Sequence, residues 1–267
     1  TGDFERATDE FDKVAENADD PGAKSEALLG GAVARFESGD REGSVESLRQ
    51  AQEAAPVASE LAWEAGYLLG RRLNEAEEYG DARDTLAPLA EAGAHPLQPF
   101  VLSEYATALS RSGDRAGAER AWDQLLGMEI SSTFRAEIFR ARADAARGAG
   151  DRDAQATWLD AYVTETGDAG ARLERAEAAA QLGDDATFAG TLQLLIARSP
   201  GSRFAPVALA ALEEAGAPVD PGTAGLVYYR HGEYERAIEV LQEGLTFAES
   251  PEAVTYRTYY LAAAWEA

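Results

Sequence analysis

A glycine followed by an acidic residue recurs along the whole chain, and its spacing constrains the fold more than any other feature. The pairs are Gly2-Asp3, Gly39-Asp40, Gly80-Asp81, Gly113-Asp114, Gly150-Asp151, Gly183-Asp184 and Gly232-Glu233. Successive glycines are 37, 41, 33, 37, 33 and 49 residues apart. Each interval is rich in Ala, Leu and Glu with helical spacing, and it has room for two helices of about three to four turns each. The pattern predicts an array of helical hairpins.

The glycine and the acid have separate roles in such a hairpin. A tight turn between two helices needs a residue that tolerates φ > 0 at the C-terminus of the first helix. The acid that follows can cap the second helix. The phrase Gly-acid-aromatic-Glu-Arg-Ala occurs at residues 2–7 and again at 232–237. We interpret the two copies as the same turn and second-helix start in different repeats.

Small residues recur at fixed distances from these glycines. Seven residues before the glycine lie Ala32, Ala106, Ala143, Ala176 and Gly225, and five residues after it lie Ala7, Ser44, Ala118 and Ala237. Paired helices approach each other most closely at such positions, so Ala106, Ala118 and Ala237 should be buried. Nine residues after the glycine, bulky side chains are expected to fill the adjoining gaps: Phe11, Leu48, Trp122, Leu159, Leu192 and Leu241. Pro56 and Pro200 stand where a second helix should end.

This pattern resembles the tetratricopeptide repeat, a helix–turn–helix unit of about 34 residues. The best match is the unit formed by Gly225, Tyr228, Gly232, Tyr234 and Ala237, and the resemblance covers nearly the whole chain. It implies an all-α fold, a right-handed superhelix (α-solenoid) of tetratricopeptide-like helix–turn–helix repeats, with residues 1–267 in a single domain. The unit around Gly80 is expected to have a lengthened first helix. The units around Gly150 and Gly183 lack the later small residue.

Two segments depart from the regular repeat. Residues 198–222 contain Pro-Gly and Pro-Val-Asp-Pro-Gly breakers around an apolar stretch, which predicts an extra helix at about 203–215 and a minor joint in the domain. Near the C-terminus, Ala262 and Trp265 stand where the small and aromatic residues of a first helix belong. The next turn glycine would then fall beyond Ala267, so we expect this chain to be part of a longer polypeptide with a further C-terminal domain.

The charge of the chain excludes some classes of partner. Lys and Arg total 24 against 48 Asp and Glu, which gives a formal charge of −24. Such a field repels nucleic-acid phosphates and anionic lipid, so we expect neither as a partner. No apolar run approaches the roughly 18 residues of a membrane span. With no cysteine, the chain has no disulfide, thiolate metal site or thiol nucleophile.

No catalytic or metal-binding motif is recognisable. The two histidines, His95 and His231, do not have the spacing of zinc ligands. Asp151 and Asp153 begin like a calcium loop, but the central Gly and the terminal Glu of that loop are missing. Adjacent acids such as those at 184–185 are more typical of a hydrated face than of an acid–base pair. We therefore predict no catalytic residue, no metal and no cofactor.

Binding is the remaining function. In a helical superhelix, the inward faces of the first helices line a groove suited to a peptide or a neighbouring domain. By register, this face includes Phe36, Phe100, Arg111, Arg140, Arg147, Tyr229 and Arg230. Aromatic and Arg side chains are good anchors, although Phe36 and Phe100 could equally belong to the core. We interpret Tyr256, Tyr259, Tyr260 and Trp265 as a packing surface for a following helix.

Residues 198–245 also resemble a stretch of the bacterial soluble lytic murein transglycosylases, with an extra helix before a Gly-containing hairpin. Members of that family have an N-terminal α-superhelical domain followed by a lysozyme-like domain that cleaves peptidoglycan. The resemblance implies a non-catalytic scaffold domain in cell-wall turnover, located outside the cytoplasm. Its partner would be the catalytic domain of its own chain, and its contact with peptidoglycan would be indirect.

The catalytic Glu of that family lies in a Glu-Ser-x-Phe motif. The pairs Glu37-Ser38, Glu46-Ser47 and Glu249-Ser250 lack the Phe, so none of them is assigned this role. The alternative function is an adaptor with no enzyme attached, which binds a peptide or a partner subunit in the concave groove of its tetratricopeptide repeats.

Overall fold

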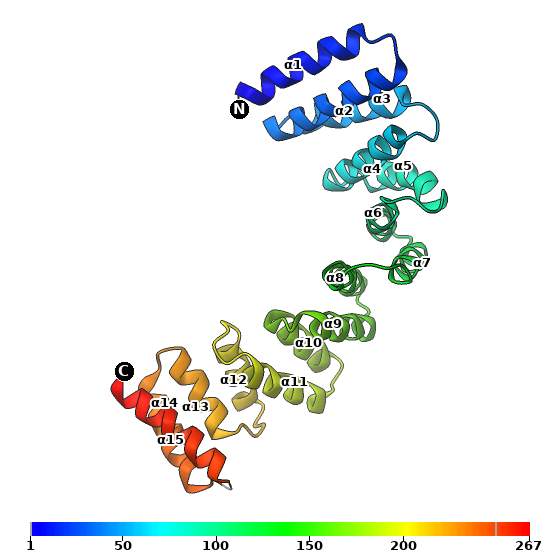
Figure 1. The fold of residues 1–267 in the computed structure, drawn as a ribbon. Helices are drawn as coiled ribbons and strands as arrows, with labels where there is room; N and C mark the ends of the chain where they lie inside the picture. Colours follow the sequence, from blue (N-terminus) through cyan, green and yellow to red (C-terminus); the bar gives the residue numbers. More distant parts are fainter. Residues whose placement is uncertain (1, 249) are drawn as a thin grey trace. The chain divides into compact units, whose positions relative to one another are not determined.

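The chain is all-α in the computed structural model, which describes residues 2–248 and 250–267 (Figure 1). These residues form 15 helices and no strand. They fall into two compact units, residues 1–131 (unit 1) and 132–267 (unit 2). The all-α helical-repeat class predicted from the sequence is confirmed. The prediction of one continuous domain concerns how the units are joined, and it stays a prediction.

Unit 1 consists of three hairpins preceded by one helix. Its helices are α1 (Gly2–Asn17), α2 (Pro21–Ser38), α3 (Arg41–Ala54), α4 (Glu60–Glu75), α5 (Tyr79–Glu91), α6 (Gln98–Arg111) and α7 (Arg115–Leu126). The hairpins are α2–α3, α4–α5 and α6–α7, and their first helices contact one another in the order α2, α4, α6. This contact places the first helices of unit 1 side by side.

Unit 2 repeats this plan with one insertion. Its helices are α8 (Ser132–Gly148), α9 (Arg152–Thr166), α10 (Ala169–Gln181), α11 (Asp185–Arg198), α12 (Ala205–Glu214), α13 (Pro221–Arg230), α14 (Tyr234–Thr246) and α15 (Pro251–Glu266). The hairpins are α8–α9, α10–α11 and α13–α14, and α12 lies between the last two in the chain. Helix α12 is the extra helix expected at 203–215.

The predicted turn chemistry is confirmed at most of the hairpins. Gly39, Gly113, Gly150, Gly183 and Gly232 all have positive φ, between 72° and 95°. The aspartate after each of the first four accepts a hydrogen bond from the backbone N–H three residues later. The prediction is wrong for Glu233, which begins α14 without a side-chain cap. Its side chain is one methylene longer than that of Asp, a favoured capping residue.

The turn of the α4–α5 hairpin is not at Gly80, and this prediction is wrong. Gly80 lies inside α5, whereas Glu77 has φ 63° and occupies the place that glycine has in the other turns. With Glu77 as the reference, Gly70 comes seven residues before the turn and Ala82 comes five residues after it, and both are buried. The first helix is therefore of ordinary length, and the repeat is regular.

The small residues lie buried between the paired helices, as predicted. Ala32, Ala106, Ala143, Ala176, Ser44, Ala118 and Ala237 are between 0 and 2% exposed. At Gly70 and Gly225 the approach is closer still, because an added Cβ would lie 2.3 Å from Leu86 and 2.4 Å from Leu241. On α1, Ala7 and Phe11 are only partly covered, since α2 is the principal neighbour of this helix.

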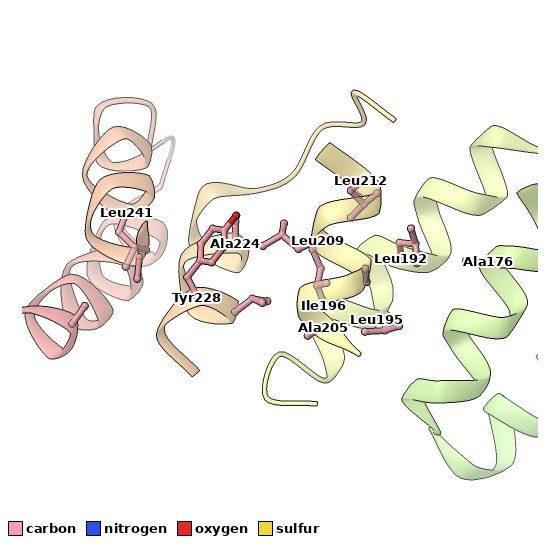
Figure 2. Close-up of a cluster of buried hydrophobic side chains, with 14 of the residues drawn as sticks. Ala176, Leu192, Leu195, Ile196, Ala205, Leu209, Leu212, Ala224, Tyr228 and Leu241 are labelled. Atoms are coloured by element: carbon pink, nitrogen blue, oxygen red, sulfur yellow. The ribbon is translucent and has the colours of Figure 1, made fainter. Parts of the chain in front are cut away.

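The largest apolar core of unit 2 includes the inserted helix. Figure 2 shows Leu209 and Leu212 of α12 together with Leu192, Leu195 and Ile196 of α11 and with Ala224 and Tyr228 of α13. Leu209 and Leu212 are 1% and 0% exposed. Helix α12 is thus packed on both neighbouring hairpins.

A polar network also ties α12 to the hairpin after it. The Tyr228 hydroxyl donates a hydrogen bond to Glu213 Oε1 at 2.8 Å and accepts one from Arg236 at 2.7 Å. The Arg236 guanidinium also lies 4.2 Å from the centroid of the Tyr228 ring. Burial and the Glu213 carboxylate raise the pKa of Tyr228 to about 12. One phenol therefore connects three helices.

The Tyr228→Phe variant should lower the free energy of unfolding by about 1–2 kcal/mol at neutral pH, because the hydrogen bonds of the buried Tyr228 hydroxyl with Glu213 and Arg236 are lost. The raised pKa favours the neutral phenol in the folded state, so this contribution is complete below pH ~10 and is lost as the pH rises from ~10 to ~12. Denaturant titrations of both proteins between neutral pH and the alkaline range measure the difference. The matched control is Tyr259→Phe, at a tyrosine 67% exposed. A pH-independent difference would contradict the prediction.

Candidate partner-binding surfaces

Side chains of α4 and α6 form a connected surface on the first helices of unit 1. The rings of Tyr67 and Phe100 lie 6.4 Å apart between centroids. Asn74 donates hydrogen bonds from Nδ2 to the Glu104 carboxylate at 2.8 Å and to the Glu104 carbonyl oxygen at 2.9 Å. Arg111 is exposed at the end of α6. We call these five residues the α4–α6 face.

Phe100 does not belong to the core. Its side chain is 46% exposed, whereas the next two residues of α6, Val101 and Leu102, are 0% and 1% exposed and supply the packing. Phe36 is half-buried, with the guanidinium carbon of Arg72 3.3 Å from its ring centroid. Of the two phenylalanines predicted for the groove, Phe100 therefore lies on the α4–α6 face, and Phe36 packs against the end of α4.

Glu104 is the titratable group of the α4–α6 face. Burial raises its pKa above the usual range, although the hydrogen bond from Asn74 and the nearby charge of Arg71 act in the opposite direction. An acid in this setting favours a cationic or hydrogen-bond-donating neighbour, because such a group compensates for the water that the carboxylate has lost.

Tyr67, Asn74 and Glu104 are not among the residues that the sequence predicts for the groove. Asn74 comes three residues before Glu77, as Phe36 comes three before Gly39. The turn was expected at Gly80, three residues after Glu77. Counted from Gly80, Asn74 does not fall at the position that Phe36 has relative to Gly39, so the two residues could not be recognised as equivalent. The sequence does contain a signal for a turn at Glu77. Small residues, Gly70 and Ala82, lie seven residues before it and five residues after it, as they do around the turn glycines.

In unit 2, Arg140 and Arg147 bind to acids of the same unit. Arg140 lies 3.2 Å from Asp144 and 3.0 Å from Glu174, and Arg147 lies 2.8 Å and 3.7 Å from the same two carboxylates. The four charges link α8 to α10 and neutralise one another. The structure thus brings together two of the four arginines predicted for the groove, but as partners of an internal ion-pair network.

Tyr229 belongs to an aromatic cluster at the other end of unit 2. Its ring centroid lies 5.9 Å from that of Tyr234 and 5.6 Å from that of Tyr260, which in turn lies 4.9 Å from that of Tyr256. Arg230 follows it on α13 and is exposed. Tyr259 and Trp265 of α15 are also exposed. The prediction that α15 presents a packing surface for a following helix stays a prediction.

The six residues predicted to bind a partner are therefore distributed over three places. Phe100 and Arg111 lie on α6 in unit 1, Arg140 and Arg147 lie on α8, and Tyr229 and Arg230 lie on α13. Arg140 and Arg147 are held in an internal ion-pair network, whereas the surfaces of Phe100 and of Tyr229 both carry exposed aromatic side chains. The surface of Phe100 also carries the partly desolvated carboxylate of Glu104. The α4–α6 face is the strongest candidate of the three.

The histidines have structural contacts. His95 stacks on Trp63 with the ring centroids 4.0 Å apart, and its Nε2 lies 3.0 Å from Glu60. His231 caps α13 and lies 3.2 Å from the carbonyl oxygen of Pro200. In the described part of the chain, no three His, Asp or Glu side chains gather in a way that could hold a metal. None of the described helices combines the length and the apolar character needed to cross a membrane.

The two Glu-Ser pairs within the described residues do not form a site. Glu37 is exposed near the end of α2, and Glu46 is exposed on α3. Glu249 lies outside the described residues. The two described glutamates lack the desolvation that a general acid requires.

Comparison with known proteins shows the fold. No protein-family model and no curated protein matches the chain in sequence. Among solved structures, the C-terminal part of a TPR repeat-containing protein from Cytophaga hutchinsonii has a TM-score of 0.60 and 11% identity, with 95% of this chain and 94% of that chain covered. A tetratricopeptide repeat protein from Parabacteroides merdae has a TM-score of 0.52 and 16% identity, with 90% and 98% covered.

A third similar structure is PilW, described as a widely conserved type IV pilus biogenesis factor. It has a TM-score of 0.55 and 18% identity, with 78% of this chain and 91% of that chain covered. At such identities the likeness extends to the fold alone. The chain therefore has a helical-repeat fold of the tetratricopeptide type.

Proposed function

We propose that this chain is a protein-interaction module that binds a peptide or a partner protein on the α4–α6 face. The observation that carries the proposal is the exposure of Phe100, 46%, on a helix whose packing is supplied by other residues. Aromatic and Arg side chains contribute most of the binding energy at protein interfaces. Tyr67 and Arg111 extend the same surface along α4 and α6.

The electrostatics of the chain indicate a basic partner. The net charge of −24 favours a positively charged segment, and Glu104 places a partly desolvated carboxylate on the surface itself. Arg140 and Arg147 are secondary candidates, because a partner would have to compete with Asp144 and Glu174 for them. Tyr229 and Arg230 are likewise kept as secondary candidates.

A phage-displayed library of linear peptides tests the proposal, with the full chain as the target. We expect enriched peptides to carry Lys or Arg and to bind about tenfold or more weakly to Phe100→Ala, the usual effect of removing an aromatic anchor. The matched control is Phe4→Ala on α1 of the same unit, where the side chain is 42% exposed. Binding to Phe4→Ala should equal binding to the unmodified chain.

The opposite result would reject the proposed surface. If enriched peptides bind Phe100→Ala as tightly as the unmodified chain, their site lies elsewhere. If the library yields no peptide that the chain binds at micromolar concentration, the module does not recognise linear segments in this way.

A second candidate function comes from the resemblance of residues 198–245 to lytic murein transglycosylases. It is favoured by the packing of α12 between two hairpins, the arrangement that the resemblance implies. On this candidate, the chain is a scaffold for a catalytic domain elsewhere in its polypeptide, it acts in peptidoglycan turnover, and it is located outside the cytoplasm.

Two measurements separate this candidate from a stand-alone adaptor. The gene should encode a Glu-Ser-x-Phe motif in a lysozyme-like sequence after residue 267, and an epitope-tagged protein should fractionate with the cell envelope. The 267-residue chain should release no soluble fragments from purified murein. A gene with no such motif would leave the adaptor as the function.

A further inference from the structure

A small cavity lies at the turn edge of unit 1, outside the α4–α6 face. Its lining comes from the end of α2, the start of α3 and the turn after α4, and consists of Phe36, Arg41, Glu42, Val45, Arg49, Arg72, Glu75, Ala76 and Glu78. Its volume is about 160 Å³. A cavity of about 150 Å³ lined by aliphatic and aromatic groups accommodates benzene. The space therefore suits one apolar side chain.

The lining favours an uncharged group inside the cavity. Arg72 covers the ring of Phe36 and pairs with Glu75 at 2.7 Å, while Arg49 lies 3.6 Å from Glu78. These charges neutralise one another in pairs. Arg41 and Glu42 add one charge of each sign to the lining. A charged side chain entering between these groups would lose water without meeting a net counter-charge, whereas an apolar side chain would gain the contacts of Phe36 and Val45.

A second, more open hollow adjoins the first and is acidic. It has a volume of about 370 Å³ and is lined by Arg49, Gln52, Leu73, Asp81, Asp84, Thr85 and Pro88. Arg49 belongs to both hollows and lies 3.4 Å from Asp81. Asp84 is paired with Arg83 at 2.7 Å, so three carboxylates, Glu78, Asp81 and Asp84, share two guanidinium groups. Residues bound next to the apolar side chain would therefore meet net negative charge.

We propose that the two hollows together bind a basic linear segment of a partner protein, with one aromatic or leucine-like side chain of that segment in the 160 Å³ cavity. Lys or Arg residues next to this anchor lie over Asp81 and Asp84. The site is distinct from the α4–α6 face, so it goes beyond the function proposed above and does not depend on it.

The probe is an acetylated and amidated peptide, Lys-Phe-Arg-Lys-Lys, with the same peptide carrying Ser in place of Phe as the control ligand. The full chain is titrated with each peptide by calorimetry, and the methyl resonances of Val45 are followed by NMR.

The blocking variant is Ala76→Phe. Ala76 is exposed and lines the cavity, so the new phenyl ring fills the space without disturbing the core. The matched control variant is Ala92→Phe, at the exposed C-cap of α5 outside the cavity.

We expect the Phe peptide to shift the Val45 resonances and to bind the unmodified chain and Ala92→Phe equally. Ala76→Phe should weaken its binding about tenfold or more, and the Ser peptide should bind about tenfold more weakly than the Phe peptide. Phe4→Ala, at a residue 42% exposed on α1, should leave the affinity unchanged. Equal affinity for Ala76→Phe, equal affinity of the two peptides, or no binding up to ~1 mM would each overturn the proposal. Loss of binding in Phe100→Ala alone would place the peptide on the α4–α6 face, which supports the proposed function and rejects the cavity.

Discussion

Replacement of Gly70 by Leu should lower the free energy of unfolding of unit 1 by about 3 kcal/mol, the upper part of the range for overpacked cores. An added Cβ at this position would already lie 2.3 Å from Leu86, which is 0% exposed and has no room to move away. Chemical denaturation of the purified chain measures the loss. Hydrogen exchange should show it as weaker protection of the amides of α4 and α5.

The matched control is Gly80→Leu, the same substitution in the other helix of the same hairpin. No atom lies within 4 Å of a Cβ added to Gly80, and its backbone is helical. The variant should therefore gain about 0.5–1 kcal/mol from helix propensity. A loss at Gly80 as large as the loss at Gly70 would contradict the placement of the turn at Glu77.

Leu209→Ala should lower the free energy of unfolding of unit 2 by about 3 kcal/mol, because the cavity left behind cannot collapse between two packed hairpins. The side chain is 1% exposed and belongs to the core that joins α11, α12 and α13. Denaturation and hydrogen exchange of α11 to α13 measure the effect. If α12 packed only loosely on its neighbours, its amide hydrogens would exchange rapidly even in the unmodified chain.

Leu194→Ala on α11 is the control for this prediction. Leu194 is 46% exposed, so the same substitution should change the free energy of unfolding by no more than about 0.5 kcal/mol. A small effect at both leucines would mean that the inserted helix contributes little to the core of unit 2.

Turns and helix ends could be predicted from the sequence, because they depend on residues that are close together in the chain. The four Gly-Asp turns were predictable because each aspartate caps a helix only three residues ahead, and its glycine adopts a positive φ that few other residues tolerate. Helix α12 was predictable because Pro and Gly enclose it on both sides. The turn at Glu77 was harder to recognise, because glutamate rarely adopts a left-handed conformation and only the small residues Gly70 and Ala82 mark this turn in the sequence.

The candidate surfaces were predictable only in part. Register placed Arg140 and Arg147 on one face of α8, but their shared acid Glu174 is on α10, and its distance from them depends on how the two hairpins pack. Phe100 was assigned to the groove or the core with equal weight, since its position alone does not tell how much of the ring its neighbours cover. The 160 Å³ cavity involves three consecutive helices and has no counterpart in a linear motif.

Seven helices begin beside an aspartate whose carboxylate accepts a backbone N–H of the first turn: Asp20, Asp40, Asp114, Asp151, Asp168, Asp184 and Asp220. The side chain and N–H of Thr187 hold the pKa of Asp184 below its usual range. The contribution of this cap is thus present at neutral pH and disappears as the pH falls through that lowered pKa. Strong acid would release this cap, so acid unfolding of unit 2 should start at the N-terminus of α11 rather than in the apolar core.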